Sequence, residues 1–135
     1  MTGALTPDLA IAYVRELSAD VRAAVVLDPA GERVAGDTRL APAARAAAAA
    51  LRGAAAVAAS THLDDRGIVT VVVTADHTLL VISGPLAFEG PTLIDARAAA
   101  AAMTQMAPET IAAAPPETLK SAVEREISEF SRQTT

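Results

Sequence analysis

The sequence predicts an α/β protein of the layered α+β kind, with one antiparallel five-stranded sheet and helices on its faces. Two observations lead to this prediction. Short segments rich in Val, Ile, Leu and Thr alternate with longer segments whose apolar residues recur at helical spacing. Consecutive strands are joined by turns too short for a crossover, so they must run antiparallel.

Eight segments carry these patterns, in the order helix, two strands, helix, three strands, helix. They are a helix at 7–19, strands at 23–27 and 32–35, a helix at 42–52, strands at 57–63, 68–74 and 78–83, and a helix at 90–107. A further amphipathic helix follows near the C-terminus.

The first helix begins with Thr6, Pro7 and Asp8, because a capping hydroxyl, a proline at the first helical position and an acid in the first turn are all typical of helix starts. Its apolar residues form one face; they are Leu9, Tyr13, Val14 and Leu17, with Val21 beyond the helix. The hairpin that follows turns at Asp-Pro-Ala-Gly, residues 28–31, which are the residues that a type I turn prefers.

The second helix consists almost entirely of alanine. Asp37 or Thr38 is expected to cap its start, and Gly53 is expected to end it, because glycine readily takes the left-handed conformation. The segment after Gly53 is compatible with a helix tail or a strand. Its β-branched residues and the turn at 64–67 favour a strand.

The strands at 68–74 and 78–83 have the clearest β patterns and are expected to form the central pair of the sheet. Gly90 and Pro91 open the last helix of the domain, and Pro108 closes it.

The chain is therefore expected to contain one domain at 1–107 and an appendage at 108–135. The appendage reads as a linker ending in Pro115-Pro116 and then a helix with an apolar side. That side comprises Leu119, Val123, Ile127 and Phe130.

Composition excludes several classes of function. The net charge is −5 and no Lys/Arg cluster offsets it, so nucleic acid is not an expected partner. The chain has no cysteine, which excludes disulfides and thiolate metal sites. No apolar run is long enough to span a bilayer, and the first residues lack a basic leader. We therefore expect a cytoplasmic protein without membrane insertion.

The residues also offer no convincing catalytic centre, and the sequence predicts a protein that is not an enzyme. His62 and His77 are its only histidines, and no nucleophile elbow accompanies them. His62 could join Asp64 and Asp65 in a metal site, but a solvated loop explains this spacing better. Asp28 and Asp76 read as turn formers rather than as an acid/base pair. No phosphate-binding loop is present, so no cofactor or metal is expected.

The element order and the hairpin from Val25 to Ala35, VVLDPAGERVA, resemble the roadblock/dynein light-chain family. The long Val- and Ile-rich hairpin ending in Gly84-Pro85 is similar as well. The resemblance covers about 7–107 and implies a profilin-like or roadblock-like fold. It further implies a non-enzymatic module that forms dimers through its second helix and an adjacent strand. Family members bind small Ras-like GTPases or motor components, and bacterial members often regulate a GTPase encoded nearby.

The resemblance makes four residues of the second helix candidates for a dimer or partner interface, namely Arg45, Ala48, Ala49 and Arg52. An alanine face lets two helices approach closely, which suits such an interface. Equally, the alanines could pack on the protein's own sheet. A sharper hypothesis is that Arg39, Arg45 or Arg52 supplies an arginine finger to a partner's phosphoryl transfer, although exposed arginines ordinarily only aid solubility.

Two other functions remain open. The chain could be a small-ligand sensory domain of the PAS or profilin-like type, which shares the Asp-x-x-Gly hairpin, or an adaptor in a sensor-kinase system. The low aromatic content, 2%, argues against a ligand pocket, because such pockets usually combine aromatic walls with convergent polar groups.

Overall fold

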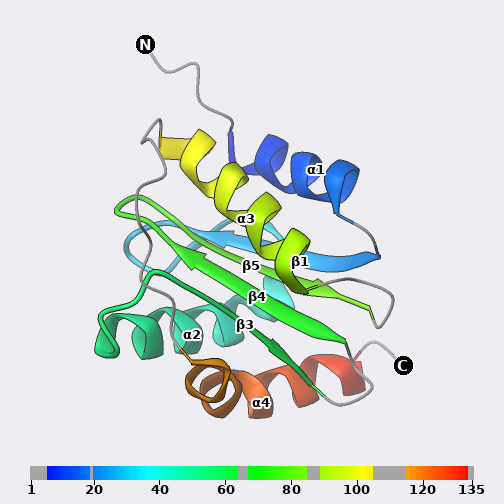
Figure 1. Cartoon of the computed structure of the whole chain (residues 1–135), viewed down its shortest axis with the longest axis vertical. Coiled ribbons are helices and arrows are strands. Elements are labelled where there is room, and N and C mark those ends of the chain that lie inside the picture. Colours follow the sequence, from blue (N-terminus) through cyan, green and yellow to red (C-terminus); the bar gives the residue numbers. More distant parts are fainter. Residues whose placement is uncertain (1–5, 19, 64–66, 85–88, 105–114, 134–135) are drawn as a thin grey trace.

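A single antiparallel sheet runs through the middle of the protein, as the sequence predicts (Figure 1). The structure is a computed structural model and describes residues 6–18, 20–63, 67–84, 89–104 and 115–133. The strands are β1 (Val21–Leu27), β2 (Arg33–Gly36), β3 (Ala58–His62), β4 (Ile68–Val73) and β5 (Thr78–Ser83). Their order across the sheet is β2-β1-β5-β4-β3, so β5 is central and lies between β1 and β4.

Helices cover both faces of this sheet and give the fold three layers (Figure 1). The helical elements are α1 (Pro7–Leu17), the 3₁₀ turn η1 (Thr38–Leu40), α2 (Ala41–Gly53), α3 (Glu89–Thr104) and α4 (Pro116–Gln133). The pair α1 and α3 packs on one face, and the pair α2 and α4 packs on the other. None of the described helices combines the length and apolar character needed to cross a bilayer.

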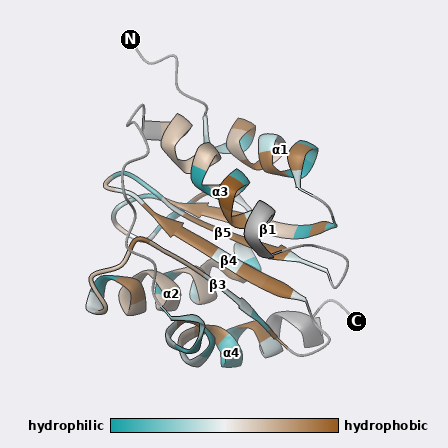
Figure 2. Cartoon of the chain, viewed as in Figure 1, coloured by the Kyte–Doolittle hydropathy of each residue, from teal (hydrophilic) through white to brown (hydrophobic). Residues whose placement is uncertain are grey.

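Each face of the sheet has its own hydrophobic core, and β1 contributes to both by alternation. Ala23, Val25 and Leu27 point toward α2 and α4, whereas Ala24 and Val26 point toward α1 and α3. Because both faces are covered, β4 and β5 are buried along their whole length, and most of their residues are hydrophobic (Figure 2).

The start of α1 agrees with the prediction: the Thr6 hydroxyl accepts the backbone N–H of Leu9 at 3.2 Å. The helix ends at Leu17, two residues before the predicted end. The predicted cap of α2 is wrong in detail, because Asp37 caps η1 instead and α2 begins without a side-chain cap.

The expected role of Gly53 is also wrong, because this glycine is the last helical residue of α2 and Ala55 takes the left-handed conformation instead, with φ of 56°. The N–H of Ala56 bonds to the carbonyl of Leu51 at 2.8 Å, and the N–H of Ala55 bonds to that of Arg52 at 3.1 Å. This pair of bonds is a Schellman motif. It forms here without the glycine that usually occupies the left-handed position.

The amphipathic tail helix is present as α4, and it packs against α2 and β3. Leu119, Val123 and Ile127 are buried in the same core as the underside of α2. The side chain of Phe130 and the proposed boundary at 107/108 lie outside the described residues. The described part of the appendage therefore contributes to the core of the domain.

Candidate functional site

The four candidate interface residues of α2 do not share one environment. Arg45, Ala49 and Arg52 are exposed, whereas Ala48 is only 3% exposed and belongs to the core over the sheet. The alternative reading, in which alanines pack on the protein's own sheet, therefore holds for Ala48 and for its neighbours Ala44 and Ala47.

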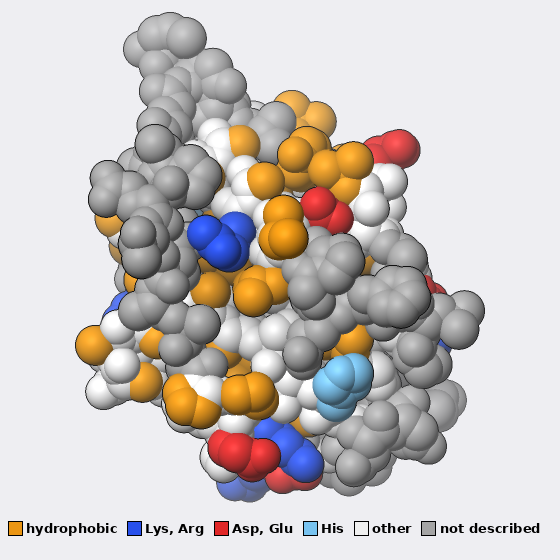
Figure 3. All heavy atoms as spheres, in the orientation of Figure 1, with side chains coloured by type: hydrophobic (Ala, Val, Ile, Leu, Met, Phe, Trp, Pro, Cys, Tyr) orange, Lys and Arg blue, Asp and Glu red, His pale blue; other side chains and the backbone are white. Residues whose placement is uncertain are grey.

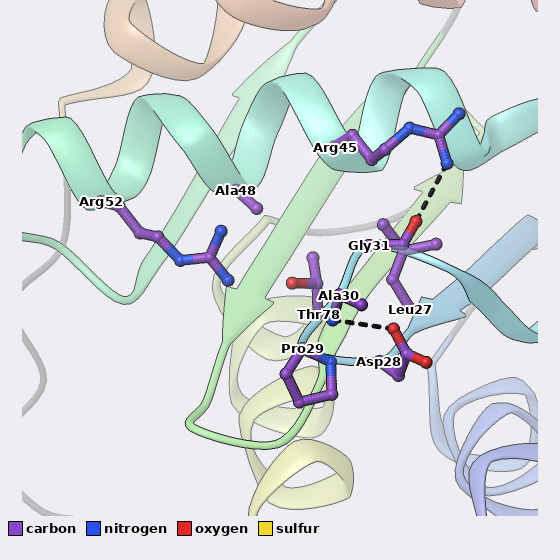
Figure 4. Close-up of a pocket in the computed structure, with 9 residues that line it drawn as sticks. All are labelled: Leu27, Asp28, Pro29, Ala30, Gly31, Arg45, Ala48, Arg52 and Thr78. Carbon is purple, nitrogen blue, oxygen red and sulfur yellow. Dashed lines mark hydrogen bonds between the residues drawn. The ribbon is translucent and has the colours of Figure 1, made fainter.

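A pocket of about 220 Å³ lies between α2 and the β1–β2 turn, at one end of the sheet (Figure 4). Its lining residues are Leu27, Asp28, Pro29, Ala30, Gly31, Arg45, Ala48, Arg52 and Thr78. Leu27 and Thr78 are cross-strand partners of β1 and β5, so the sheet supplies two of these residues directly. Three of the four candidate residues line the pocket, and Ala49 does not.

The turn that forms one wall of the pocket is fixed by its own hydrogen bonds. The N–H of Gly31 donates to the carbonyl of Asp28 at 2.9 Å, which closes the predicted turn. One carboxylate oxygen of Asp28 accepts the N–H groups of Ala30 and Glu32, at 2.9 and 3.0 Å. Asp28 thus has the turn-forming role expected from the sequence.

Arg45 ties this turn to α2. Its guanidinium donates to the carbonyl of Gly31 at 3.0 Å (Figure 4). Gly31 has φ of 87°, and a Cβ at this position would lie 3.4 Å from Cδ of Arg45. The aliphatic part of the arginine therefore lies close to the glycine, and its charged end defines one side of the pocket.

Arg52 and Thr78 lie at the other side, where their polar ends point toward one another (Figure 4). Most of the Thr78 residue is buried, but its hydroxyl is open to the pocket and has no hydrogen-bond partner among the described residues. The Arg52 guanidinium likewise has neither a hydrogen bond nor an ion pair with the described part of the chain. The paired N–H donors of Arg52 and the hydroxyl of Thr78 thus face the same small space.

The third arginine considered from the sequence, Arg39, is engaged elsewhere. Its guanidinium pairs with Asp37 at 2.7 Å, and Asp37 also accepts the backbone N–H of Arg39 at 3.0 Å. The hydrogen bond from Arg39 lowers the pKa of the Asp37 carboxyl and raises the pKa of Arg39. This pair stabilises η1 and takes no part in the pocket.

The two histidines are not among the pocket-lining residues and lie at the end of β3 and in the β4–β5 turn. His62 is exposed at the end of β3, and its suggested metal partners Asp64 and Asp65 lie outside the described residues. His77 lies in the β4–β5 turn, and its Nδ1 is buried without a partner in the described chain. No cluster of three or more His, Asp or Glu side chains suited to a metal occurs in the described ranges.

A second surface feature was missed by the sequence reasoning. The expected apolar face of the first helix is only partly correct, because α1 buries Ala10 and Val14 but leaves Leu9, Tyr13 and Leu17 exposed. Leu9 and Leu17 are 55% and 53% exposed, and Ile94 on the neighbouring α3 is 64% exposed. Figure 3 shows the hydrophobic side chains that gather over α1 and α3. The sequence shows that these side chains of α1 are spaced four residues apart, but it does not show whether they face the core or the solvent.

Comparison with known proteins adds no relative: no family model, curated protein or solved structure matches the chain.

Proposed function

We propose that the chain is a non-enzymatic homodimeric module with a regulatory or scaffolding role. The observation that carries this proposal is the exposed row of Leu9, Tyr13 and Leu17 on α1, which continues to Ile94 on α3. Single exposed apolar residues are common, but several on one face favour an interaction surface. The hydroxyl of Ser18 donates to Asp95 at 2.8 Å and holds the end of α1 beside the middle of α3.

The pattern of the row favours a second copy of the chain as its occupant. Leu9 and Leu17 are each four residues from Tyr13, so the order Leu-Tyr-Leu is the same along the helix in either direction. A two-fold axis at Tyr13 would place Leu9 of one copy against Leu17 of the other, as an isologous contact requires. Such an arrangement also brings the acidic first turn, at Asp8, toward the basic last turn, at Arg15, of the partner helix.

The α2 surface supports dimerisation less well. Ala48 is buried, and α4 packs against both β3 and α2, the helix that the family resemblance would place at the interface together with an adjacent strand. Four of the five residues of β3 are also buried. Ala49, Arg45 and Arg52 are exposed on α2, so this helix is the alternative candidate for the dimer interface.

The two interfaces can be separated by light scattering after size-exclusion chromatography. We expect the unaltered chain to be a dimer and Leu17→Glu to be a monomer at the same concentration, because the glutamate would place a charge in an apolar contact. Ala49→Glu makes the same change at an exposed site on α2 and should remain a dimer. Both sites are exposed, so circular dichroism should show unchanged folding.

The opposite result, a monomeric Ala49→Glu and a dimeric Leu17→Glu, would assign the interface to α2. A chain that is monomeric over the whole accessible concentration range would remove the homodimer from the proposal.

The class of partner rests on the element order, which is the order found in the structure and the one that resembles roadblock proteins. On that basis we propose a small Ras-like GTPase as the regulated partner. The test is to mix the chain with a Ras-like GTPase encoded near its gene, loaded either with GDP or with a non-hydrolysable GTP analogue. Complex formation that depends on the nucleotide supports regulation, and no complex in either state contradicts it.

A ligand-sensing role is the second candidate, and the pocket at the end of the sheet favours it. The space directly beneath α2 is filled by the core, including Ala44, Ala47 and Leu51. A sensor of this architecture would therefore have to bind its ligand beside α2 rather than under it.

A further inference from the structure

We propose that the pocket between α2 and the β1–β2 turn binds a small oxyanion, namely a phosphate or carboxylate group of a small molecule. The proposal concerns a different face of the protein from the row on α1 and does not depend on dimerisation. It rests on the unused donors of Arg52 and Thr78, which face one another in a preformed recess.

The Thr78 hydroxyl is the first support. A hydroxyl that is open to a recess and has no protein partner can donate a hydrogen bond to a bound ligand. Thr78 lines the pocket, and its hydroxyl has no partner among the described residues. A ligand oxygen in the recess would supply that partner.

Arg52 defines the charge of the ligand. Its guanidinium presents planar, paired N–H donors, whose geometry matches the two oxygens of a carboxylate or the edge of a phosphate. No described carboxylate pairs with it. The arginine and the hydroxyl can therefore both donate hydrogen bonds to an anion in the pocket.

The other charged groups determine where the anionic group lies. Asp28 repels an anion at the turn side, although one of its oxygens is already bound by two backbone N–H groups. Arg45 is two helical turns from Arg52, a rise of about 10 Å along the helix, and is attached to the Gly31 carbonyl. The anionic group is thus placed beside Arg52 and Thr78, and the rest of the ligand extends toward Arg45.

The volume limits the size of the ligand. At about 220 Å³ the pocket is smaller than the roughly 300–1,000 Å³ of sites for drug-sized molecules. None of its lining residues is aromatic, so no ring is available to stack on a base. A small phosphorylated or carboxylated metabolite fits this recess, whereas a nucleotide base would find no stacking surface.

The test is an NMR titration of the ¹⁵N-labelled full chain with inorganic phosphate and, separately, with succinate. Ionic strength is held constant with sodium chloride, because surface arginines also attract anions non-specifically. We expect saturable shifts confined to the amides around Gly31, Ala48 and Thr78. Saturation by phosphate alone or by succinate alone identifies the source of the oxyanion, and either result supports the site.

Matched variants connect the binding to its donors. Arg52→Gln should weaken binding by at least about tenfold, since it removes a charge-assisted pair of hydrogen bonds. Thr78→Val keeps the shape of the side chain and should weaken binding by about three- to tenfold. Arg15→Gln removes the same charge from α1 on the opposite face and should leave the affinity unchanged.

The proposal is overturned if neither probe gives saturable local shifts, or if Arg15→Gln weakens binding as much as Arg52→Gln. The spectra of the variants also report whether each remains folded. Leu17→Glu should bind the probe with unchanged affinity, so a failed dimer and a failed anion site remain distinguishable.

Discussion

Ala55 is the residue at which a small change should stabilise the protein. An L-residue in the left-handed conformation carries a cost of about 1–2 kcal/mol, which glycine avoids. Ala55 has φ of 56° and is the left-handed residue of the Schellman motif that ends α2. We expect Ala55→Gly to raise the free energy of unfolding by about 1 kcal/mol, measured by urea denaturation.

Gly53 offers the matched comparison, since it lies two residues earlier within the helix and no other group lies within 4 Å of its missing Cβ. Gly53→Ala should also stabilise, by about 0.5–1 kcal/mol, because glycine is the poorer helix former. Loss of stability in Ala55→Gly together with a gain in Gly53→Ala would show that the left-handed residue is not a source of strain.

The Asp37–Arg39 pair should give stability a small dependence on pH. The hydrogen bond from Arg39 holds the pKa of Asp37 below its ordinary value of 3.8 in the folded protein. The pair therefore contributes stability above about pH 4, and this contribution is lost as the pH falls through the lowered pKa. Because both side chains are partly exposed and solvent screens the pair, we expect this contribution to be small at neutral pH.

The measurement is a double-mutant cycle of Asp37→Asn and Arg39→Gln, followed by denaturation between pH 7 and pH 3. Asparagine keeps the oxygen that caps η1 and removes only the charge. The coupling energy should be present at pH 7 and shrink below pH 4, whereas a coupling that grows on acidification would contradict the assigned cause.

At the scale of elements, α4 should contribute substantially to stability. Leu119 is completely buried between α4, α2 and β3, and truncating a buried leucine to alanine typically costs about 2–5 kcal/mol. Leu119→Ala should therefore lower the thermal midpoint by many degrees in calorimetry. Ser121→Ala, on the exposed side of the same helix, should leave it within about 0.5 kcal/mol of the unaltered chain. Equal effects of the two changes would mean that α4 does not contribute to the folded core.

The elements themselves were largely predictable because their signals are local. The Thr-Pro-Asp start of α1, the turn at 28–31 and the strand at 78–83 all match the structure within a residue or two. The predictions that were wrong concern features that tertiary packing determines. Which side of α1 is buried depends on α3 and the sheet, and whether Asp37 caps α2 or η1 depends on the path of the chain onto the sheet.

At the scale of the whole molecule, the layered sheet followed from the order of the elements, but the pocket did not. The turn and α2 were each predicted, and Arg45 and Arg52 were singled out for a different reason. Their meeting with Thr78 depends on the pairing of Leu27 with Thr78 across 51 positions of sequence, and on the packing of α2 over the same end of the sheet. Local patterns carry no information about such a register.

The attachment of α4 to the domain has a consequence for any attempt to study the two parts separately. A segment joined to its binding surface by a short stretch of chain experiences an effective concentration of roughly millimolar, even when the protein itself is dilute. Cutting the chain before Pro115 would remove this advantage and leave the apolar surface of α2 and β3 open to water. The detached helix would then bind the domain only weakly, as a separate ligand. The remaining domain would be prone to associate through the apolar surface that the helix had covered.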